Sequence, residues 1–420
     1  MYVKKFAGVV LALCIGCNLT ACAADTEELY EIQLSGADYN TITPRTEEET
    51  ERSGVIDAGT SRIVAEEQEE RRESAARLSL KEEKRKNPTA ISQTQYAYSC
   101  LMESEQRVYS EILDCILTHQ EEISLSVTDL KTVDLAYKAV NADHGGLFWV
   151  NGYSVVEHSL AGVVTDLEFL PQYTMDAAEK DKLQAQVDSA VEDFLSGISL
   201  SASDYEKTKY VYEQLITKVD YDENAKENQN ILSVFLYGST VCQGYADATQ
   251  YLLAQLGVES FVVTGTTRNE NHAWTCARLD GEYYYIDTTF GNSMYSGDSR
   301  GFEGKFVNYE YLNITGEELS RNHVTDMPFD MPSCTARTDN YYVKENLYYT
   351  TFDPSAVGNL LRASWEGDRA MVSVKFADTE LYDQAYAYFI RGKHIADYCD
   401  GLESYSYVDD TAKAVLTIGF

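Results

Sequence analysis

Cys242 occupies a position where a cysteine can act as a nucleophile. It lies in "GSTVCQGYADATQYLLAQLGVES", where a loop gives way to an apolar helical pattern. A cysteine in the first turn of a helix lies beside unpaired backbone N–H groups and the positive end of the helix dipole, and both stabilise a thiolate. Gly244 leaves room for another chain beside the sulfur. By itself this pattern also fits a buried structural cysteine.

A histidine and an aspartate further along the chain have the spacing needed to meet. In "NHAWTCARLDGEYYYIDTTF", Asp280–Gly281 lies between two aromatic or β-branched runs and predicts a two-residue hairpin turn. The resulting register puts Asp287 opposite Trp274. His272 lies on the same face as Trp274, which makes it the diagonal neighbour of Asp287, about 7–8 Å away at the backbone. We therefore expect a hydrogen bond between His272 and Asp287, close to a helix-start cysteine.

Three stretches of the chain resemble the motifs of a known family. "VCQGYADATQYLLAQLGV", "NHAW" and "YYYIDTTFGN" resemble the three motifs of the transglutaminase-like superfamily, which shares the papain-like core. The resemblance covers about residues 205–295 and has the Cys, His, Asp order of the family. It implies that Cys242 is the nucleophile, that His272 is base and acid, and that Asp287 orients the imidazole. The implied reaction is acyl transfer from a peptide or carboxamide carbonyl.

Other groups are candidates for binding the substrate. The backbone N–H of Cys242 is a plausible oxyanion donor. For the second donor the upstream segment "KENQNILSVFLYG" offers Gln229 and Asn230. Trp274 can wall the site, although a core aromatic residue needs no such function.

No metal or cofactor is expected from the sequence. No two cysteines outside the N-terminal apolar run have zinc-ligand spacing. Residues 220–231 begin like a calcium-binding EF-hand loop, but Ala225 and Ile231 occupy the positions that need glycine and glutamate. His323 and His394 have no partner that the sequence identifies.

The N-terminus predicts export and a lipid anchor. Residues 1–22 combine two lysines with the apolar run "FAGVVLALCIGC", which is too short to span a bilayer, and end in "LTAC". This ending matches a bacterial lipobox, in which Cys22 receives lipid and becomes the mature N-terminus. The alternative is an ordinary signal peptide cut near "ACAA". We expect an extracytoplasmic protein on the bacterial cell surface, anchored to the membrane through lipid on Cys22.

The rest of the chain divides into four predicted parts, which together predict an α+β fold. Residues 23–90 are highly charged and predict a disordered stalk. An N-terminal helical α+β region follows over 91–200, and the transglutaminase-like, papain-like core spans 201–330. Residues 338–420 predict a small Tyr-rich α+β module, in which alternating apolar residues indicate strands.

Apolar spacing also predicts particular helices. One continuous helix is expected over 93–119, and two more over 178–198 and 203–222. Ser203 or Asp204 can cap the last of these.

The charge balance limits the possible partners. Lys and Arg number 34 against 68 Asp and Glu, for a net charge of −34, and most of the excess lies beyond residue 86. Such a balance opposes nucleic-acid binding, which needs clustered basic residues. It can favour basic substrates, or be only a solvated acidic surface. A protein or peptide substrate is expected, whereas the oligomeric state stays open.

Three functions are compatible with the site residues. Water as the acceptor makes a cysteine peptidase or amidase, which we favour. A lysine amine as the acceptor makes a cross-linking protein-glutamine gamma-glutamyltransferase. The third function is a non-catalytic surface module that binds peptide or glycan and retains the three residues for structure.

Overall fold

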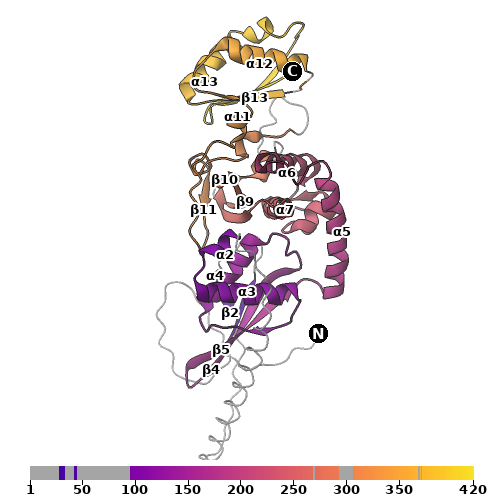
Figure 1. The fold of residues 1–420 in the computed structure, drawn as a ribbon, viewed down its shortest axis with the longest axis vertical. Coiled ribbons are helices and arrows are strands. Elements are labelled where there is room, and N and C mark those ends of the chain that lie inside the picture. Colours follow the sequence, from indigo (N-terminus) through magenta and orange to yellow (C-terminus); the bar gives the residue numbers. More distant parts are fainter. Residues whose placement is uncertain are drawn as a thin grey trace, which may run out of the picture. The chain divides into compact units, whose positions relative to one another are not determined.

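The structure is a computed structural model, and it describes residues 28–33, 42–44, 95–267, 270–292, 306–367, 369 and 371–420. Cys22, the predicted signal segment and most of the predicted stalk lie outside the described residues. Within these ranges, no helix is both long and apolar enough to cross a membrane. The chain mixes helices and strands, which confirms the α+β class (Figure 1). By its contacts it forms two compact units, one of residues 1–189 with 327–330 and one of 190–326 with 331–420.

The first unit is built on a five-stranded sheet with the order β2-β1-β4-β5-β3. Helices α3 and α4 pack on each other, and the long hairpin β4–β5 forms the centre of the sheet. The elements are β1 (Glu28–Gln33), β2 (Ile42–Pro44), α2 (Tyr96–Cys100), α3 (Glu103–Leu117), β3 (Ile123–Ser124), α4 (Leu130–Asp143), β4 (Val150–Leu160) and β5 (Val163–Tyr173). Helix α5 (Ala177–Leu195) follows and runs across the boundary between the units.

Strands β1 and β2 correct part of the predicted stalk. β1 pairs antiparallel with β4 and with β2, so these two stretches belong to a sheet. The physical reason is present in "ELYEIQ", where Tyr30 and Ile32 alternate with polar residues as in a strand.

The predicted helix over 93–119 is also corrected, because it breaks between α2 and α3. Leu101 and Met102 both have extended backbone angles. The carboxylate of Glu105 accepts a hydrogen bond from the Met102 N–H at 2.7 Å and so starts a new helix. Asp143 accepts the N–H groups of Ala97 and Tyr98, which holds α2 in its own direction. Apolar residues keep helical spacing across the break, so periodicity alone does not locate it.

The second unit contains a four-stranded antiparallel sheet with the order β10-β9-β8-β11. Helix α7 packs against β8 and β9, and α6 packs against α7. The elements are α6 (Asp204–Lys218), β6 (Asp220–Tyr221), η1 (Ser233–Tyr237), β7 (Ser239–Thr240), α7 (Cys242–Gln255), β8 (Ser260–Thr267), β9 (Glu270–Leu279), β10 (Glu282–Ile286), α8 (Thr288–Gly291), η2 (Tyr309–Tyr311), α10 (Gly316–Leu319) and β11 (His323–Thr325). Ser203 caps α6 by accepting the N–H of Glu206, as expected.

The β9–β10 hairpin has the predicted register. Glu282 pairs with Leu279, and Ile286 pairs with Thr275. Asp280 and Gly281 have φ values of 49° and 94°, the positive values that a type I′ turn requires. Because the next position after Ile286 is Asp287, this register brings that carboxylate to the end of β10 opposite Trp274.

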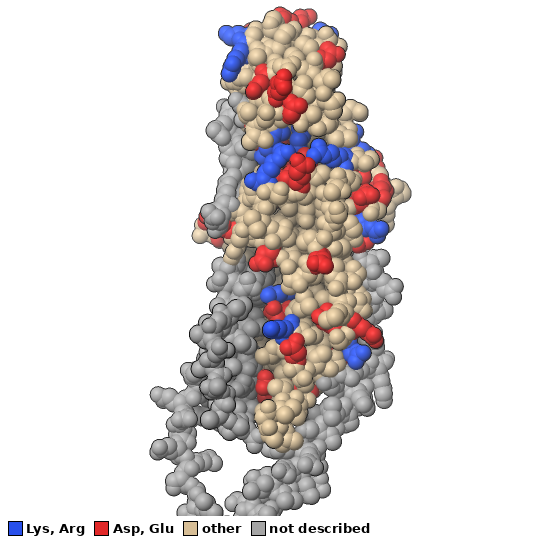
Figure 2. Space-filling model, turned by 90° about the vertical axis from the view of Figure 1, so that its left-hand side faces the viewer, with Lys and Arg blue, Asp and Glu red and all other residues tan. Residues whose placement is uncertain are grey.

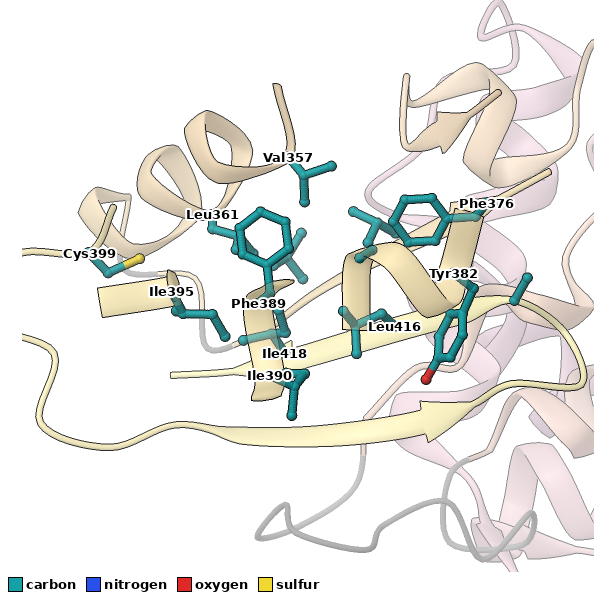
Figure 3. Close-up of a cluster of buried hydrophobic side chains, with 14 residues drawn as sticks. Val357, Leu361, Phe376, Tyr382, Phe389, Ile390, Ile395, Cys399, Leu416 and Ile418 are labelled. Carbon is teal, nitrogen blue, oxygen red and sulfur yellow. The ribbon is translucent and has the colours of Figure 1, made fainter. Parts of the chain in front are cut away.

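The C-terminal part of the second unit has a separate hydrophobic core. Its sheet has the order β12-β13-β15-β14. Figure 3 shows side chains of α12, α13 and the sheet meeting in a cluster that includes Leu361, Phe389 and Ile418. The elements are α11 (Tyr341–Lys344), β12 (Tyr348–Tyr349), α12 (Pro354–Glu366), β13 (Met371–Phe376), α13 (Thr379–Tyr386), η3 (Ala387–Arg391), η4 (His394–Asp397), β14 (Ser406–Asp410) and β15 (Val415–Gly419).

Ion pairs join this C-terminal part to the rest of the second unit. Lys375 of β13 contacts Glu318 of α10 at 2.6 Å, with both side chains 8% exposed. Lys413 contacts Glu310 at 2.5 Å. On the face shown in Figure 2, basic side chains gather in a band across the upper half and occur in smaller groups elsewhere, among acidic side chains scattered over the whole face.

We expect Lys375→Met to destabilise the fold by about 3–5 kcal/mol, because it leaves a buried carboxylate without its cation. Burial raises the pKa of Glu318, but Lys375 and Thr315 outweigh it and lower that pKa from 4.5 to about 2. The pair therefore stabilises the fold fully above about pH 4.5, and this contribution is lost as the pH falls toward 2. Urea unfolding at neutral pH tests the substitution. The double variant Lys375→Met with Glu318→Gln should recover part of the loss, and equal instability in both variants would contradict the account.

Candidate active site

Cys242 is the first residue of α7, as the sequence predicts. The preceding residue, Val241, has extended backbone angles and no side-chain cap, so the first N–H groups of the helix have no intrahelical partner. The thiol is half-buried. Strand β7 leads directly into it and pairs in parallel with β6, which fixes where the helix begins.

Gly244 faces a packed contact. A Cβ atom on Gly244 would collide with the side chain of Thr240 and lie 3.0 Å from Ser233 Oγ. These two hydroxyls are 2.6 Å apart, and the Thr240 side chain donates to the carbonyl of Asn228 at 3.1 Å. The expectation that Gly244 leaves room for another chain is therefore wrong, because that space is filled by the loop that positions the thiol.

Gly244→Ala is expected to destabilise the protein by about 1–3 kcal/mol and to slow alkylation of Cys242, because Thr240 and the start of α7 must move apart. Urea unfolding and residue-resolved alkylation measure the two effects. Gly316→Ala is the matched control, since a Cβ there meets its nearest neighbours at an ordinary 3.7 Å. A Gly244→Ala variant as stable and as reactive as the control would contradict the packing argument.

His272 and Asp287 meet as the hairpin register requires. His272 Nε2 lies 2.8 Å from Asp287 Oδ2, and both side chains are essentially inaccessible to solvent. The thiol of Cys242 lies close enough to His272 to raise the pKa of the imidazole. Because Asp287 occupies Nε2, Nδ1 is the ring nitrogen left for the sulfur. The three residues named from the sequence therefore lie together, with His272 between Cys242 and Asp287.

The charges of these three residues reinforce one another. Burial alone lowers the pKa of His272, but the charge and hydrogen bond of Asp287, followed by those of Cys242, raise it to about 10. Burial likewise raises the pKa of Asp287, but His272 and then His323 hold it well below its usual range. Asp287 is thus an anion, and His272 is stabilised in the imidazolium form that can accompany a thiolate.

Asp287 also starts the next helix. Its Oδ1 atom accepts the N–H of Phe290 at 2.9 Å, which caps α8. Thr288 lies 2.8 Å from Thr249 of α7 between their hydroxyl oxygens. The helix that carries the thiol and the strand end that carries the carboxylate are therefore linked directly.

The structure places the other three predicted site residues as follows. Trp274 is 1% exposed and stacks on the His272 ring with centroids 5.9 Å apart, so it supports the imidazole from inside the core. Gln229 is exposed and donates to Asn228. Asn230 accepts the N–H of Leu232 in its own loop. Neither amide has a contact with Cys242 within the described part of the chain.

His323 is the residue that sequence reasoning missed. Its Nε2 atom lies 2.9 Å from Asp287 Oδ2, and its side chain is fully buried. His323 lies in β11, an edge strand of only three residues. The sequence around it does not indicate that this strand pairs with β8, so the position of His323 could not be predicted. His272, Asp287 and His323 bring their ligand atoms within 4.8 Å, close enough to hold a metal ion. Their short N···O distances instead match two N–H groups donating to one carboxylate oxygen.

The described cysteines also include a buried pair. Cys276 and Cys334 have Sγ atoms 3.9 Å apart, and both residues are buried. None of the six described cysteines forms a disulfide bond.

Comparisons with known proteins identify the family of the core. The family model of the transglutaminase-like superfamily matches residues 193–288. No curated protein sequence matches the chain. Among solved structures, a TGase is 13% identical over 33% of this chain and 44% of its own, with a TM-score of 0.25.

Two further solved structures are similar. A proposed cysteine protease of Cytophaga hutchinsonii is 14% identical over 32% of this chain and 61% of its own, with a TM-score of 0.23. A proposed protease of Parabacteroides distasonis is 12% identical over 34% of this chain and 37% of its own, with a TM-score of 0.21. Each match spans less than two thirds of the solved chain. Residues 193–288 therefore form a core of the transglutaminase-like superfamily.

Proposed function

We propose that this protein is a thiol-dependent acyl-transfer enzyme that acts on peptide or carboxamide bonds, with water as its favoured acceptor. The observation that carries the proposal is the buried hydrogen bond between His272 and Asp287 beside the helix-start thiol of Cys242. A half-buried thiol at a helix start is accessible to a substrate, whereas the two partners behind it are buried.

The chemistry follows from the order of the groups. The Cys242 thiolate attacks the carbonyl carbon and forms a C–S bond, and the backbone N–H of Cys242 stabilises the oxyanion. The imidazolium of His272 donates its Nδ1 proton to the leaving nitrogen as the C–N bond breaks. A water molecule then gives a proton to His272 Nδ1 and attacks the thioester, which breaks the C–S bond and restores the thiolate. Asp287 keeps the Nε2 proton in place throughout.

The acceptor distinguishes the proposed hydrolase from a cross-linking enzyme. A lysine amine that replaces water would form an isopeptide bond from the same thioester. A mixture of a glutamine peptide, a labelled primary amine and water enriched in ¹⁸O separates the two, because hydrolysis puts ¹⁸O into the product acid and transamidation puts the amine into the peptide. We expect ¹⁸O incorporation to dominate.

We also propose where the protein is located in the cell. We infer an extracytoplasmic protein held on a bacterial membrane by lipid on Cys22, on the basis of "LTAC" and the short apolar run before it. In a bacterial host, Cys22→Ala should move the protein from the membrane fraction to the soluble fraction. An unchanged distribution would overturn the anchor.

The decisive experiment is alkylation of the full chain by iodoacetamide from about pH 4 to about pH 10, with each cysteine measured separately by mass spectrometry. Cys242 should react with a midpoint well below that of an ordinary thiol, because His272 stabilises its anion. Cys100 is the exposed internal reference. Because burial of its sulfur raises the pKa of Cys100, free cysteine alkylated in parallel gives the midpoint of an ordinary thiol. His272→Ala should move the midpoint of Cys242 upward.

One outcome would reject the catalytic proposal. If Cys242 reacts no faster than Cys100 at neutral pH, and His272→Ala changes nothing, the site holds an ordinary thiol. The binding of peptide or glycan by a non-catalytic module would then be the better account.

A further inference from the structure

Asp287 has more hydrogen-bond donors than the three-residue site requires. Its Oδ2 atom accepts from His272 Nε2 at 2.8 Å and from His323 Nε2 at 2.9 Å. Its Oδ1 atom accepts the N–H of Phe290 at 2.9 Å. Asp287 is completely buried, so a donor lost from this carboxylate has no route to replacement by bulk water. The second histidine therefore supplies a contact that the buried charge needs.

The fold places His323 there through a close approach of two strands. His323 pairs with Thr267 across the β8–β11 ladder, and Gly265 pairs with Thr325 two positions further on. A Cβ atom on Gly265 would collide with the carbonyl oxygen of Val324 and lie 2.8 Å from the Trp274 ring. Glycine at this position thus allows β11 to come close enough for His323 to reach Asp287.

The far side of the His323 ring is also held. Its Nδ1 atom lies 2.7 Å from Asn322 Oδ1, and the Asn322 amide donates to the Tyr311 hydroxyl at 2.9 Å. Trp274 and Phe290 contact the ring with centroids 5.1 Å away. Contacts at both ring nitrogens and with these two aromatic rings hold the imidazole in this orientation.

The titratable groups that face His323 are few. Asp287 and His272 lie on one side, with the His272 ring centroid 5.4 Å away. Tyr311 lies on the other side, its ring 6.1 Å away and covered by the Lys413 ammonium. Burial raises the pKa of Tyr311, and the Lys413 charge lowers it. Burial has the larger effect, and the pKa rises to about 12. Tyr311 is therefore neutral at ordinary pH, and the charges that matter to His323 are those of the site.

We propose that His323 is a positioning residue of this site: by donating its Nε2 proton to Asp287 Oδ2, it holds the carboxylate in the orientation that serves His272. The inference rests on the proposed function. His323 touches neither the sulfur nor the substrate position, and it acts through Asp287. The site is thus a four-residue chain, Cys242–His272–Asp287–His323.

The test compares two substitutions of one residue by the same alkylation assay. His323→Gln keeps an N–H near the position of Nε2, whereas His323→Leu removes it. His323→Leu should slow alkylation of Cys242 at neutral pH by up to about 100-fold and move its pH midpoint upward, since a misplaced Asp287 no longer supports the imidazolium. His323→Gln should keep most of the wild-type rate and the wild-type midpoint. With a peptide substrate, His323→Leu should lower kcat by a larger factor than it changes KM.

A purely structural role gives a different result. It would lower the melting temperature of both variants and leave the alkylation midpoint of the folded protein unchanged in both. An unchanged midpoint in His323→Leu, or an equal rise in both variants, would overturn the inference. His394→Leu is the matched control, because His394 pairs with Asp397 in the C-terminal part and should leave Cys242 unaffected.

One further variant keeps the inference testable. If the His323 variants do not fold, Asn322→Ala removes the partner of Nδ1 while retaining His323. A raised midpoint for Cys242 in that variant supports the inference, and an unchanged one overturns it. The same assay separates this inference from the proposed function. If the proposed function is wrong, Cys242 already reacts like an ordinary thiol in the wild-type protein.

Discussion

Replacing Cys242 with alanine is expected to lower kcat for peptide or amide hydrolysis by roughly 10⁶-fold, the size of effect seen when a covalent nucleophile is removed. Among the described cysteines, only Cys100 is more accessible than half-buried Cys242, and the other four are buried. The measurement is a single-turnover assay with an activated amide, in which the wild type accumulates a thioester that mass spectrometry detects on Cys242.

The matched control for this prediction is Cys100→Ala. It removes the other accessible thiol of the described chain and should retain full activity. The fold should survive Cys242→Ala, because the thiol is half-buried and α7 is anchored independently, through Tyr245 to the carbonyl of Val219 at 2.6 Å. Activity within tenfold of the wild type in Cys242→Ala would show that the reaction does not pass through this sulfur.

The pH dependence follows from the neighbouring imidazole. Because Asp287 and Cys242 outweigh burial and raise the pKa of His272 to about 10, the imidazolium persists through neutral pH. We expect kcat/KM to fall at high pH, as His272 loses its proton near pH 10. His272→Ala should abolish the falling limb, and a profile that keeps it would assign that limb to another group.

The parts of the site that the sequence predicts are those that depend on neighbouring residues in the chain. The turn at Asp280–Gly281 needs only two residues with positive φ, and the alternation of strand side chains then carries the register to His272 and Asp287. The helix start at Cys242 is equally local. A hydrogen bond between residues 15 positions apart could therefore be deduced without any knowledge of the tertiary fold.

The parts that the sequence does not predict depend on contacts between distant segments. His323 reaches Asp287 because a three-residue strand joins the edge of the sheet, and no periodicity is detectable in so short a segment. The role of Gly244 depends on Thr240, which precedes the helix and turns back on it. Strand β1 was missed for a related reason, since its single alternating run is surrounded by charged sequence and finds its partner, β4, more than 100 residues later.

Replacing Asp287 with asparagine is expected to lower kcat by roughly 10⁴-fold with little change in stability. The oxygen of the introduced amide can still accept the N–H of Phe290 and cap α8. The NH₂ group of that amide would then face the Nε2 atoms of His272 and His323, which both donate to the carboxylate in the wild type. Because the amide NH₂ and an Nε2–H group are both donors, the neutral His272 ring would carry its proton on Nδ1 instead of Nε2. That proton points at Cys242, so the ring cannot accept the thiol proton.

Asp287→Ala separates the catalytic contribution from the structural one. It should lose a similar amount of activity and also about 1 kcal/mol of stability, because the cap of α8 is removed. Steady-state kinetics and urea unfolding of both variants measure the two effects, and alkylation of Cys242 should shift to higher pH in each. An Asp287→Asn variant with activity within tenfold of the wild type would mean that His272 is oriented by other contacts, of which the stack on Trp274 is the nearest alternative.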